Sequence, residues 1–255
     1  AKDRAQFGEK IINFPAVYDM LALMKAKLDA GRSLLYMTAR FVDIYKCLED
    51  IQRDRKLDAD ERAEMKKYQR LADAFTPLAK GMNSEFANQN AYDAISVHGG
   101  SGFIMEYKCQ RLYRDARIFS IYEGTTQLQV VAAIRYITNG FLLGTIREWE
   151  QAPVNPAYER ELNRVKEMAN KLDACTNAVK EADNQELLDF LARHLYDMAA
   201  HCVMSHLLLQ DATAAPELFE RSLKVYVNYA EAEVEKHFNF IRKMDADQLA
   251  HYRQA

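Results

Sequence analysis

Apolar side chains recur every three or four residues along much of the chain, a spacing that predicts helices with one buried face. The first such run extends from Val17 to Leu48. Pro15 precedes it at a position that suits the first turn of a helix. Residues 49–62 are densely charged, so we expect a solvent-exposed connector there, with a new helix starting near Asp58 or Asp60.

Further helices are predicted downstream. Thr76-Pro77 has the pattern of an N-cap followed by a first-turn proline, so we expect a helix to restart there. That helix should end at the Gly99-Gly100 pair, which is a stop signal. Shorter helices are expected over residues 106–115 and 128–137.

The last hundred or so residues also have a helical pattern. Two prolines within residues 148–158 indicate a linker. Beyond the linker we expect three helices, and Asn184 and Pro216 mark the starts of the last two. These helices cover about residues 157–181, 184–211 and 216–242. We therefore divide the chain into a helical bundle of residues 1–145 and an additional helical domain of residues 146–255.

Composition favours an all-α fold. Only 9 glycines and 5 prolines occur among 255 residues, and no segment alternates as a strand would. The formal charge of −3 comes without a dense basic run, which argues against nucleic acid as a partner. No run of about eighteen apolar residues is present, so we expect no transmembrane segment.

Cysteines and histidines give no metal signature. The 4 cysteines lie far apart and form no Cys-x-x-Cys, so we interpret them as reduced packing thiols of a cytoplasmic protein. His201 and His206 are five residues apart, so they do not share one face of a helix, and we expect no metal site.

One short motif carries candidate chemistry. It is Tyr122-Glu-Gly-Thr-Thr-Gln127, a loop that leads into a helix. Taken alone, Thr125 or Thr126 would cap that helix, and Gly124 would permit unusual backbone angles. Glu123 would then only lie near the positive end of the helix dipole. The competing hypothesis is that Glu123 is a working carboxylate.

The surrounding sequence favours the second hypothesis. Several short motifs precede or contain this loop: His98-Gly-Gly-Ser-Gly-Phe103, Glu106-Tyr107, Arg111-Leu-Tyr-Arg-Asp-Ala-Arg117 and Ile121-Tyr-Glu-Gly-Thr-Thr-Gln-Leu-Gln129. Their order and spacing closely resemble the C-terminal helical domain of the acyl-CoA dehydrogenases, flavoenzymes that oxidise acyl-CoA thioesters. The resemblance extends more weakly over residues 1–145, within which residues 49–75 resemble an insertion. Residues 146–255 resemble the extra C-terminal helical domain of the larger bacterial members.

The resemblance implies a catalytic site. In that family the glutamate of this motif removes the α-proton of the substrate, which gives this role to Glu123. Its neighbours Tyr122 and Gly124 would contact the substrate. The family's Thr and Gln of Gly-Thr-x-Gln hydrogen-bond FAD, and Thr125 and Gln127 match them. Burial would make the carboxylate a stronger base.

The resemblance also implies contacts to the FAD of a neighbouring subunit. Arg4 and Phe7 match an Arg-x-x-Phe-Gly motif that contacts the cofactor's pyrophosphate, for which a guanidinium fork is well suited. Gly99 and Gly100 match a turn that lies against the adenine dinucleotide. Ser96 replaces a glutamine that is common in the family and is too short for the same contact. The implied assembly is a homodimer or homotetramer.

The implied activity is oxidation of an acyl-CoA to the 2,3-enoyl-CoA, with hydride passing to FAD and electrons then to an electron-transfer flavoprotein. Two alternatives stay open: a related acyl-CoA oxidase that reduces oxygen, and a catalytically silent helical scaffold. The family's other two domains have no counterpart here. We therefore expect a fragment of a longer enzyme of the bacterial cytoplasm, inactive alone, whose N-terminal targeting signal, if any, lies outside it.

Overall fold

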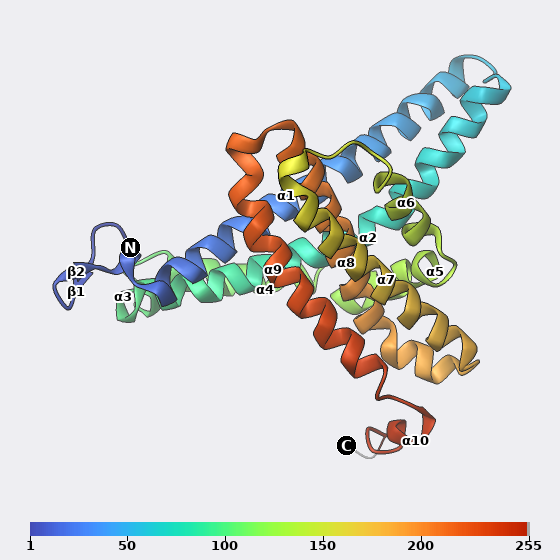
Figure 1. The fold of residues 1–255 in the computed structure, drawn as a ribbon. Helices are drawn as coiled ribbons and strands as arrows, with labels where there is room; N and C mark the ends of the chain where they lie inside the picture. The colour runs from blue at the N-terminus through green and yellow to red at the C-terminus, as the bar shows by residue number, and fades with distance from the viewer. Residues whose placement is uncertain (254–255) are drawn as a thin grey trace.

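The computed structural model describes residues 1–253, and helices make up nearly all of it (Figure 1). The α-helices are α1 (Pro15–Asp54), α2 (Ala59–His98), α3 (Gly100–Phe103), α4 (Cys109–Arg117), α5 (Thr126–Thr138), α6 (Phe141–Trp149), α7 (Glu159–Glu181), α8 (Gln185–Ala214), α9 (Pro216–Ile241) and α10 (Ala246–Leu249). Three 3-10 turns are η1 (Ile11–Asn13), η2 (Ile118–Ser120) and η3 (Pro156–Tyr158). The expected all-α fold is confirmed.

Two 40-residue helices, α1 and α2, form an antiparallel pair that runs the length of the molecule (Figure 1). α1 continues to Asp54 through part of the charged stretch, so the connector is shorter than expected. Asp58 is the N-cap of α2, as predicted. Its carboxylate accepts a bond from the Glu61 amide, and the Glu61 carboxylate accepts one from the Asp58 amide.

The predicted helix start at Thr76-Pro77 is wrong, because α2 passes through Pro77 without a break. Proline in a helix interior costs about 3 kcal/mol, since it removes a backbone hydrogen bond. Burying one large apolar side chain contributes about 1.5–3 kcal/mol, and several of these flank the proline on one face. Those buried side chains are Leu71, Phe75, Leu78, Met82 and Phe86. Packing of the continuous face therefore outweighs the local signal.

The sequence pattern missed helix α6 and an N-terminal hairpin. Helix α6 follows Gly140, whose φ of 77° lies in the left-handed region and lets the chain turn after α5. The strands β1 (Ala5–Gln6) and β2 (Glu9–Lys10) form a hairpin whose two turn residues, Phe7 and Gly8, have φ of 53° and 83°. Two residues per strand are too few to appear as an alternating pattern.

Helices α8 and α9 pack across α1, α7 packs on α8 and α9, and all of them share one hydrophobic core with α1 and α2 (Figure 1). Every residue of α8 from 198 to 209 is buried, and this helix contacts α1, α2 and α5. The starts predicted at Asn184 and Pro216 are confirmed, as N-cap and first residue. α6 runs through residue 145, and the division into parts 1–145 and 146–255 stays a prediction. Among residues 1–253, no helix has the length and apolar character needed to cross a membrane.

We expect the free energy of unfolding to decrease as the pH falls below about 6.5. Burial lowers the pKa of both His201 and His237 to about 3. The unfolded chain therefore takes up protons over this range that the folded chain does not, which favours unfolding. Asp197 has the opposite effect on stability, because burial raises its pKa to about 6 and the folded chain takes up its proton first. One aspartate is outweighed by the two histidines. Urea titrations at neutral and acidic pH measure the change.

His201→Gln should weaken this pH dependence, because glutamine does not titrate. His201 Nδ1 lies 3.0 Å from the Tyr226 hydroxyl, and glutamine keeps a polar group near that hydroxyl. His251→Gln, at an exposed histidine, is the matched control. If His201→Gln and the wild type lost stability equally on acidification, the buried neutral state of His201 would not be the cause.

Candidate functional site

The loop before α5 holds Glu123 in an unusual backbone conformation. Glu123 has a φ of 49° and Gly124 a φ of 94°, so both lie in the left-handed region. A side chain there costs about 1–2 kcal/mol. The Glu123 side chain is exposed, and Thr125 caps α5 by accepting a bond from the Leu128 amide at 3.3 Å. Residues 121–125, which we call the Glu123 turn, thus combine backbone strain with an accessible carboxylate, a combination found at functional sites.

Side chains of α2 fix the loop that carries this turn. Main-chain oxygens in loops and at the ends of helices need donors, and three residues spaced four apart on α2 supply three of them. The bonds are Lys80 Nζ to the Gly124 oxygen at 2.5 Å, Ser84 Oγ to the Phe119 oxygen at 2.9 Å and Asn88 Nδ2 to the Ala116 oxygen at 3.1 Å. The turn is therefore tied to one face of a long, packed helix.

Helix α5 and a fourth α2 residue add two further bonds. Gln129 Nε2 is a second donor to the Gly124 oxygen, at 3.3 Å. The Thr126 hydroxyl donates to the Glu85 carboxylate at 2.6 Å. Gln127, by contrast, is exposed and lies on the same open side of α5 as Leu128.

A groove of about 650 Å³ lies between α1 and α2 beside the Glu123 turn. Its walls are mainly apolar, with Leu35 and Val42 from α1 and Ala79 from α2. Phe119 and Tyr122 line the end that the loop provides. The predicted substrate contact Tyr122 thus borders a cavity of small-ligand size, and Glu123 is the next residue along the chain.

The structure also brings Arg4 to the Gly99-Gly100 turn. Arg4 Nη1 donates to the main-chain oxygen of His98 at 2.8 Å. Gly99 has a φ of 62°, and a Cβ on it would lie 2.7 Å from Arg4 Nη1. A Cβ on Gly100 would meet nothing within 4 Å. The positive φ favours glycine at 99, where Arg4 approaches closely, and the backbone at 100 is open to an incoming group.

This second cluster fits the pyrophosphate of a dinucleotide cofactor. Arg4 is exposed, and the bond to His98 is the one hydrogen bond its guanidinium makes among residues 1–253. Its remaining N–H groups can therefore donate to phosphate oxygens, beside a glycine backbone that no side chain shields. Phe7, at the hairpin tip, is 95% exposed and could extend the contact.

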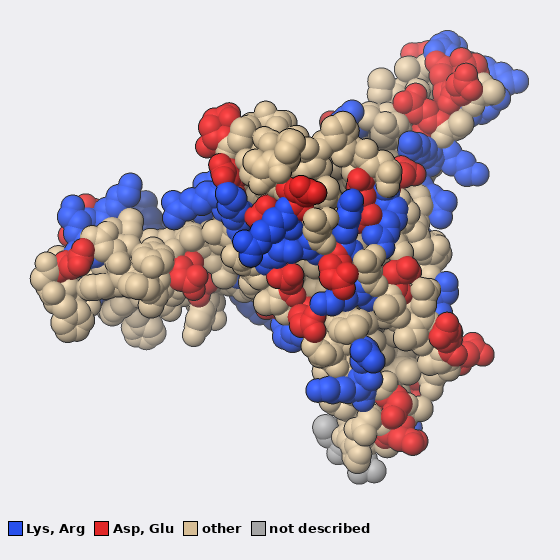
Figure 2. Space-filling view, viewed as in Figure 1, with Lys and Arg blue, Asp and Glu red and all other residues tan. Residues whose placement is uncertain are grey.

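The predicted site residues form two groups rather than one. Arg4, Gly99 and Gly100 lie at the C-terminal end of α2, whereas the Glu123 turn lies beside the middle of this helix. Ser84, beside the turn, precedes Gly99 by 15 residues, or about 22 Å of helix. The arm that holds this end has a largely uncharged surface in Figure 2, with a few acidic and basic residues on it. Phe103, the last residue of α3, and Met105 are 78% and 87% exposed.

Sequence reasoning missed the residues that hold the loop. It followed the apolar stripe Leu78, Met82 and Phe86 along α2, and the polar stripe Lys80, Ser84 and Asn88 has the same spacing. The polar stripe was a detectable signal. Its partners were not, because they are main-chain oxygens about thirty to forty residues away.

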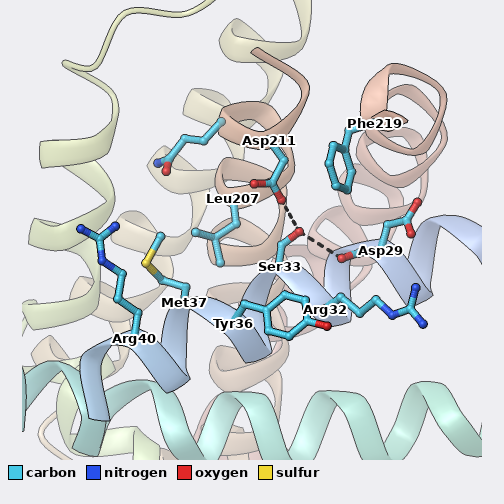
Figure 3. A pocket seen from close by; sticks show the side chains of 10 residues that line it. Asp29, Arg32, Ser33, Tyr36, Met37, Arg40, Leu207, Asp211 and Phe219 are labelled. Atoms are coloured by element: carbon cyan, nitrogen blue, oxygen red, sulfur yellow. Dashed lines mark hydrogen bonds between the residues drawn. The ribbon is translucent and has the colours of Figure 1, made fainter. Parts of the chain in front are cut away.

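A second cavity, of about 450 Å³, lies where α8 and α9 meet α1 (Figure 3). The Ser33 hydroxyl lies between the Asp211 carboxylate and the main-chain oxygen of Asp29. Ser222 of α9 donates to the Asp29 carboxylate at 2.5 Å. Burial raises the pKa of Asp211, and the bond from Ser33 opposes this. None of the predicted site residues lines this cavity, whose polar bonds tie α8 and α9 to α1.

Two family models together match nearly the whole chain. The model for the acyl-CoA dehydrogenase C-terminal domain matches residues 1–48 and 52–137, and a model named acyl-CoA dehydrogenase C terminal matches residues 138–249. The chain belongs to the acyl-CoA dehydrogenase family. Only residues 49–51 fall between the two parts of the first match, so the long insertion expected over residues 49–75 is wrong.

Curated relatives are similar over about half of this chain. The caffeyl-CoA reductase-Etf complex subunit CarC of Acetobacterium woodii is 36% identical over 143 residues, 56% of this chain and 30% of the relative. The 3-(aryl)acrylate reductase of Clostridium sporogenes is 39% identical over 129 residues, 51% of this chain and 28% of the relative. The acyl-CoA dehydrogenase of Bacillus subtilis is 31% identical over 140 residues, 55% of this chain and 31% of the relative. The matches thus span about a third of each relative.

A solved structure covers the full chain. It is the acyl-CoA dehydrogenase from Bacillus anthracis complexed with FAD, which superposes with a TM-score of 0.72 over 100% of this chain and 47% of that chain. At 21% sequence identity the likeness confirms the fold of both the bundle and the additional helices.

Replacing Glu123 by glycine should make the chain more stable than replacing it by glutamine, by about 1 kcal/mol, because glycine adopts a positive φ without strain. Both variants lack the carboxylate, so their difference isolates the backbone. Chemical denaturation measures it. A glycine variant that is no more stable than the glutamine variant would argue against a strained turn.

Proposed function

We propose that this chain is the C-terminal helical part of an FAD-dependent acyl-CoA dehydrogenase and that Glu123 is the base that removes the substrate's α-proton. The supporting observation is a strained, exposed carboxylate beside an apolar groove, on a turn tied down by Lys80. A helix cap would not need a glutamate in the left-handed region, where glycine is less strained.

The groove between α1 and α2 suits an acyl chain. Leu35, Val42 and Ala79 offer apolar contact, and the cavity of about 650 Å³ is of a size that holds a small ligand. Tyr122 and Phe119, whose ring centroids lie 6.0 Å apart, form the end wall next to Glu123. An acyl group lying in the groove would therefore bring its carbons next to the thioester to the carboxylate.

Glu123 would act as a general base. The polarised thioester carbonyl acidifies the α-proton, and a positioned carboxylate oxygen accepts it. Closure of the site by substrate and by the rest of the enzyme would remove water from the carboxylate and make it a stronger base. The two bonds to the Gly124 oxygen, from Lys80 and Gln129, keep the neighbouring peptide in place during this transfer.

Two groups of residues would hold FAD. Thr125 and Gln127 lie next to the base, whereas Arg4, Phe7, Gly99 and Gly100 would hold a pyrophosphate at the far end of α2. FAD, when bound, accepts the hydride that leaves the β-carbon of the substrate. Because the two groups are about 22 Å apart along α2, we assign them to different active sites of a homodimer or homotetramer.

The names of two relatives favour a second candidate, which is reduction of an enoyl-CoA. A caffeyl-CoA reductase subunit and an arylacrylate reductase are 36% and 39% identical to the matched parts of this chain. The same residues serve both directions, since a protonated Glu123 would return the proton to the α-carbon. The Etf complex named for the first relative supports an electron-transfer flavoprotein as partner. Assays with acyl-CoA plus an electron acceptor, and with enoyl-CoA plus a reductant, distinguish the two directions.

In the full-length enzyme, Glu123→Gln should reduce the rate of flavin reduction by acyl-CoA on the order of 10²–10⁴-fold, the usual effect of losing a positioned general base. Stopped-flow absorbance measures this rate, and the spectrum of bound FAD shows whether cofactor content is unchanged. Glu106→Gln, at an exposed carboxylate in the connection between α3 and α4, is the control. Wild-type reduction kinetics in Glu123→Gln at full FAD content would remove Glu123 from the mechanism.

Arg4→Met in the full-length enzyme should weaken FAD binding about 10- to 100-fold, because a hydrogen bond to a charged group contributes about 1.5–3 kcal/mol. Lys2→Met removes the same charge nearby and should leave FAD affinity unchanged. Titration of the apoenzyme with FAD compares the three proteins. Equal affinities for wild type and Arg4→Met would refute the pyrophosphate assignment.

A further inference from the structure

Three helices meet at Gly81 of α2, one residue beyond Lys80. Tyr196 of α8 and Gln129 of α5 both face this glycine. A Cβ on Gly81 would lie 2.1 Å from Tyr196 Oη and 3.5 Å from Gln129 Cβ. No larger residue fits at position 81 unless α8 or α2 moves. The packing of Tyr196 against Gly81 therefore sets how closely α2 and α8 approach each other.

Tyr196 is buried completely and is bonded to the same stretch of α2. Its exposed fraction is 0%, and its hydroxyl donates to the Pro77 oxygen at 2.9 Å. Burial raises the pKa of Tyr196, so the hydroxyl remains protonated and able to donate at neutral pH. The Tyr196 hydroxyl therefore fixes α8 to α2 at Pro77, three residues before Lys80.

The residues around this junction are the ones that hold the Glu123 turn. Lys80, next to Gly81, and Gln129, in contact with it, are the two donors to the Gly124 oxygen. A shift at Gly81 would displace both donors together. The peptide they hold follows Glu123 directly, so the carboxylate would move with it.

A second link runs from α8 to the start of α5. Arg193, one turn before Tyr196, bonds to Asp197 at 2.9 Å. Burial lowers the pKa of Arg193, but the carboxylates of Asp197 and Glu85 outweigh this and raise it. Glu85 in turn accepts the bond from the Thr126 hydroxyl. Both links reach the α5 end of the loop, at Gly124 and Thr126, and the step from Arg193 to Glu85 is an attraction of charges.

We propose that Tyr196 is a positioning residue for Glu123. By filling the space against Gly81, it fixes the junction of α2, α5 and α8, and through Lys80 and Gln129 it fixes the Glu123 turn. The additional helices thereby take part in catalysis as well as in folding. The proposal rests on the proposed function, in which Glu123 is the base.

Gly81→Ala in the full-length holoenzyme tests the junction. The added methyl group collides with Tyr196 Oη, so the helices must separate. We expect the rate constant of flavin reduction at saturating acyl-CoA to fall on the order of 10²-fold, as for a misplaced catalytic group. KM should change less than about threefold, because the α1 wall of the groove, with Leu35 and Val42, does not take part in the shift. The matched control is Gly144→Ala in α6, where a Cβ would meet nothing within 4 Å.

Tyr196→Phe provides a rescue. It removes the oxygen that the methyl group would strike and leaves a ring carbon 3.1 Å away. The double variant Gly81→Ala/Tyr196→Phe should therefore reduce flavin at least about tenfold faster than Gly81→Ala alone. If Gly81→Ala alone does not fold, the double variant is compared with the wild type. A rate within about tenfold of the wild type then supports the proposal, and a loss on the order of 10²-fold or more overturns it.

Hydrogen exchange gives a readout that does not depend on chemistry. The amides of residues 116–126 should exchange about tenfold faster in Gly81→Ala and return toward wild type in the double variant, while those of α7 stay unchanged. Unchanged exchange in residues 116–126, or a double variant no faster in flavin reduction than Gly81→Ala, overturns the proposal.

Glu123→Gln separates the two possible failures. If that variant turns over normally, the proposed function fails whatever the exchange data show. If it is inactive while Gly81→Ala reduces flavin at the wild-type rate, the positioning role of Tyr196 alone fails.

Discussion

The main-chain oxygens of the loop before α5 depend on donors from another part of the chain, and α2 provides them. Lys80, Ser84 and Asn88 present their side chains on one face, each bonded to a carbonyl of residues 116–124. A net contribution of about 1 kcal/mol for each bond is small beside the cost of leaving such a group buried and unpaired. Since the donors must stay in register, α2 has to remain one continuous helix through this region. The buried residues Leu78, Met82 and Phe86, which hold this stretch of α2 against the core, therefore serve the candidate site as well.

Strain at Glu123 is tolerated because the surroundings determine the turn from both sides. Its φ of 49° would be more easily adopted by glycine, yet the bonds to Gly124 and the cap at Thr125 hold the chain after it. Before it, the Tyr122 amide donates to the Ile118 oxygen at 3.0 Å. The chain thus contains a local conflict between residue type and backbone angle, at a carboxylate that directly follows Tyr122, a residue that lines the apolar groove. Such conflicts persist where the rest of the structure compensates for them.

The additional helices are joined to the bundle by more than apolar packing. Ser33 and Ser222 link Asp211 and Asp29 across α1, α8 and α9, and Tyr196 bonds to the middle of α2. Polar bonds of this kind contribute little net free energy, but they fix relative positions, because only one arrangement satisfies them. The apolar core favours association of the two parts, and these bonds set the alignment that the Glu123 turn requires.

Helix periodicity, caps and the motif around Glu123 were present in the sequence itself. They determined the all-α class, the N-cap at Asp58, the starts at Asn184 and Pro216, and the candidate residues Arg4, Gly99 and Glu123, because each depends on local spacing or on a motif. The continuity of α2 through Pro77, the hairpin at Phe7 and the pairing of Arg4 with Gly99 were decided only by the tertiary structure. In the same way, the polar stripe of α2 acquires its meaning from carbonyls that lie far away in sequence. Contacts between distant segments leave no periodic trace in either segment, so only the folded chain could show which donors hold the Glu123 turn.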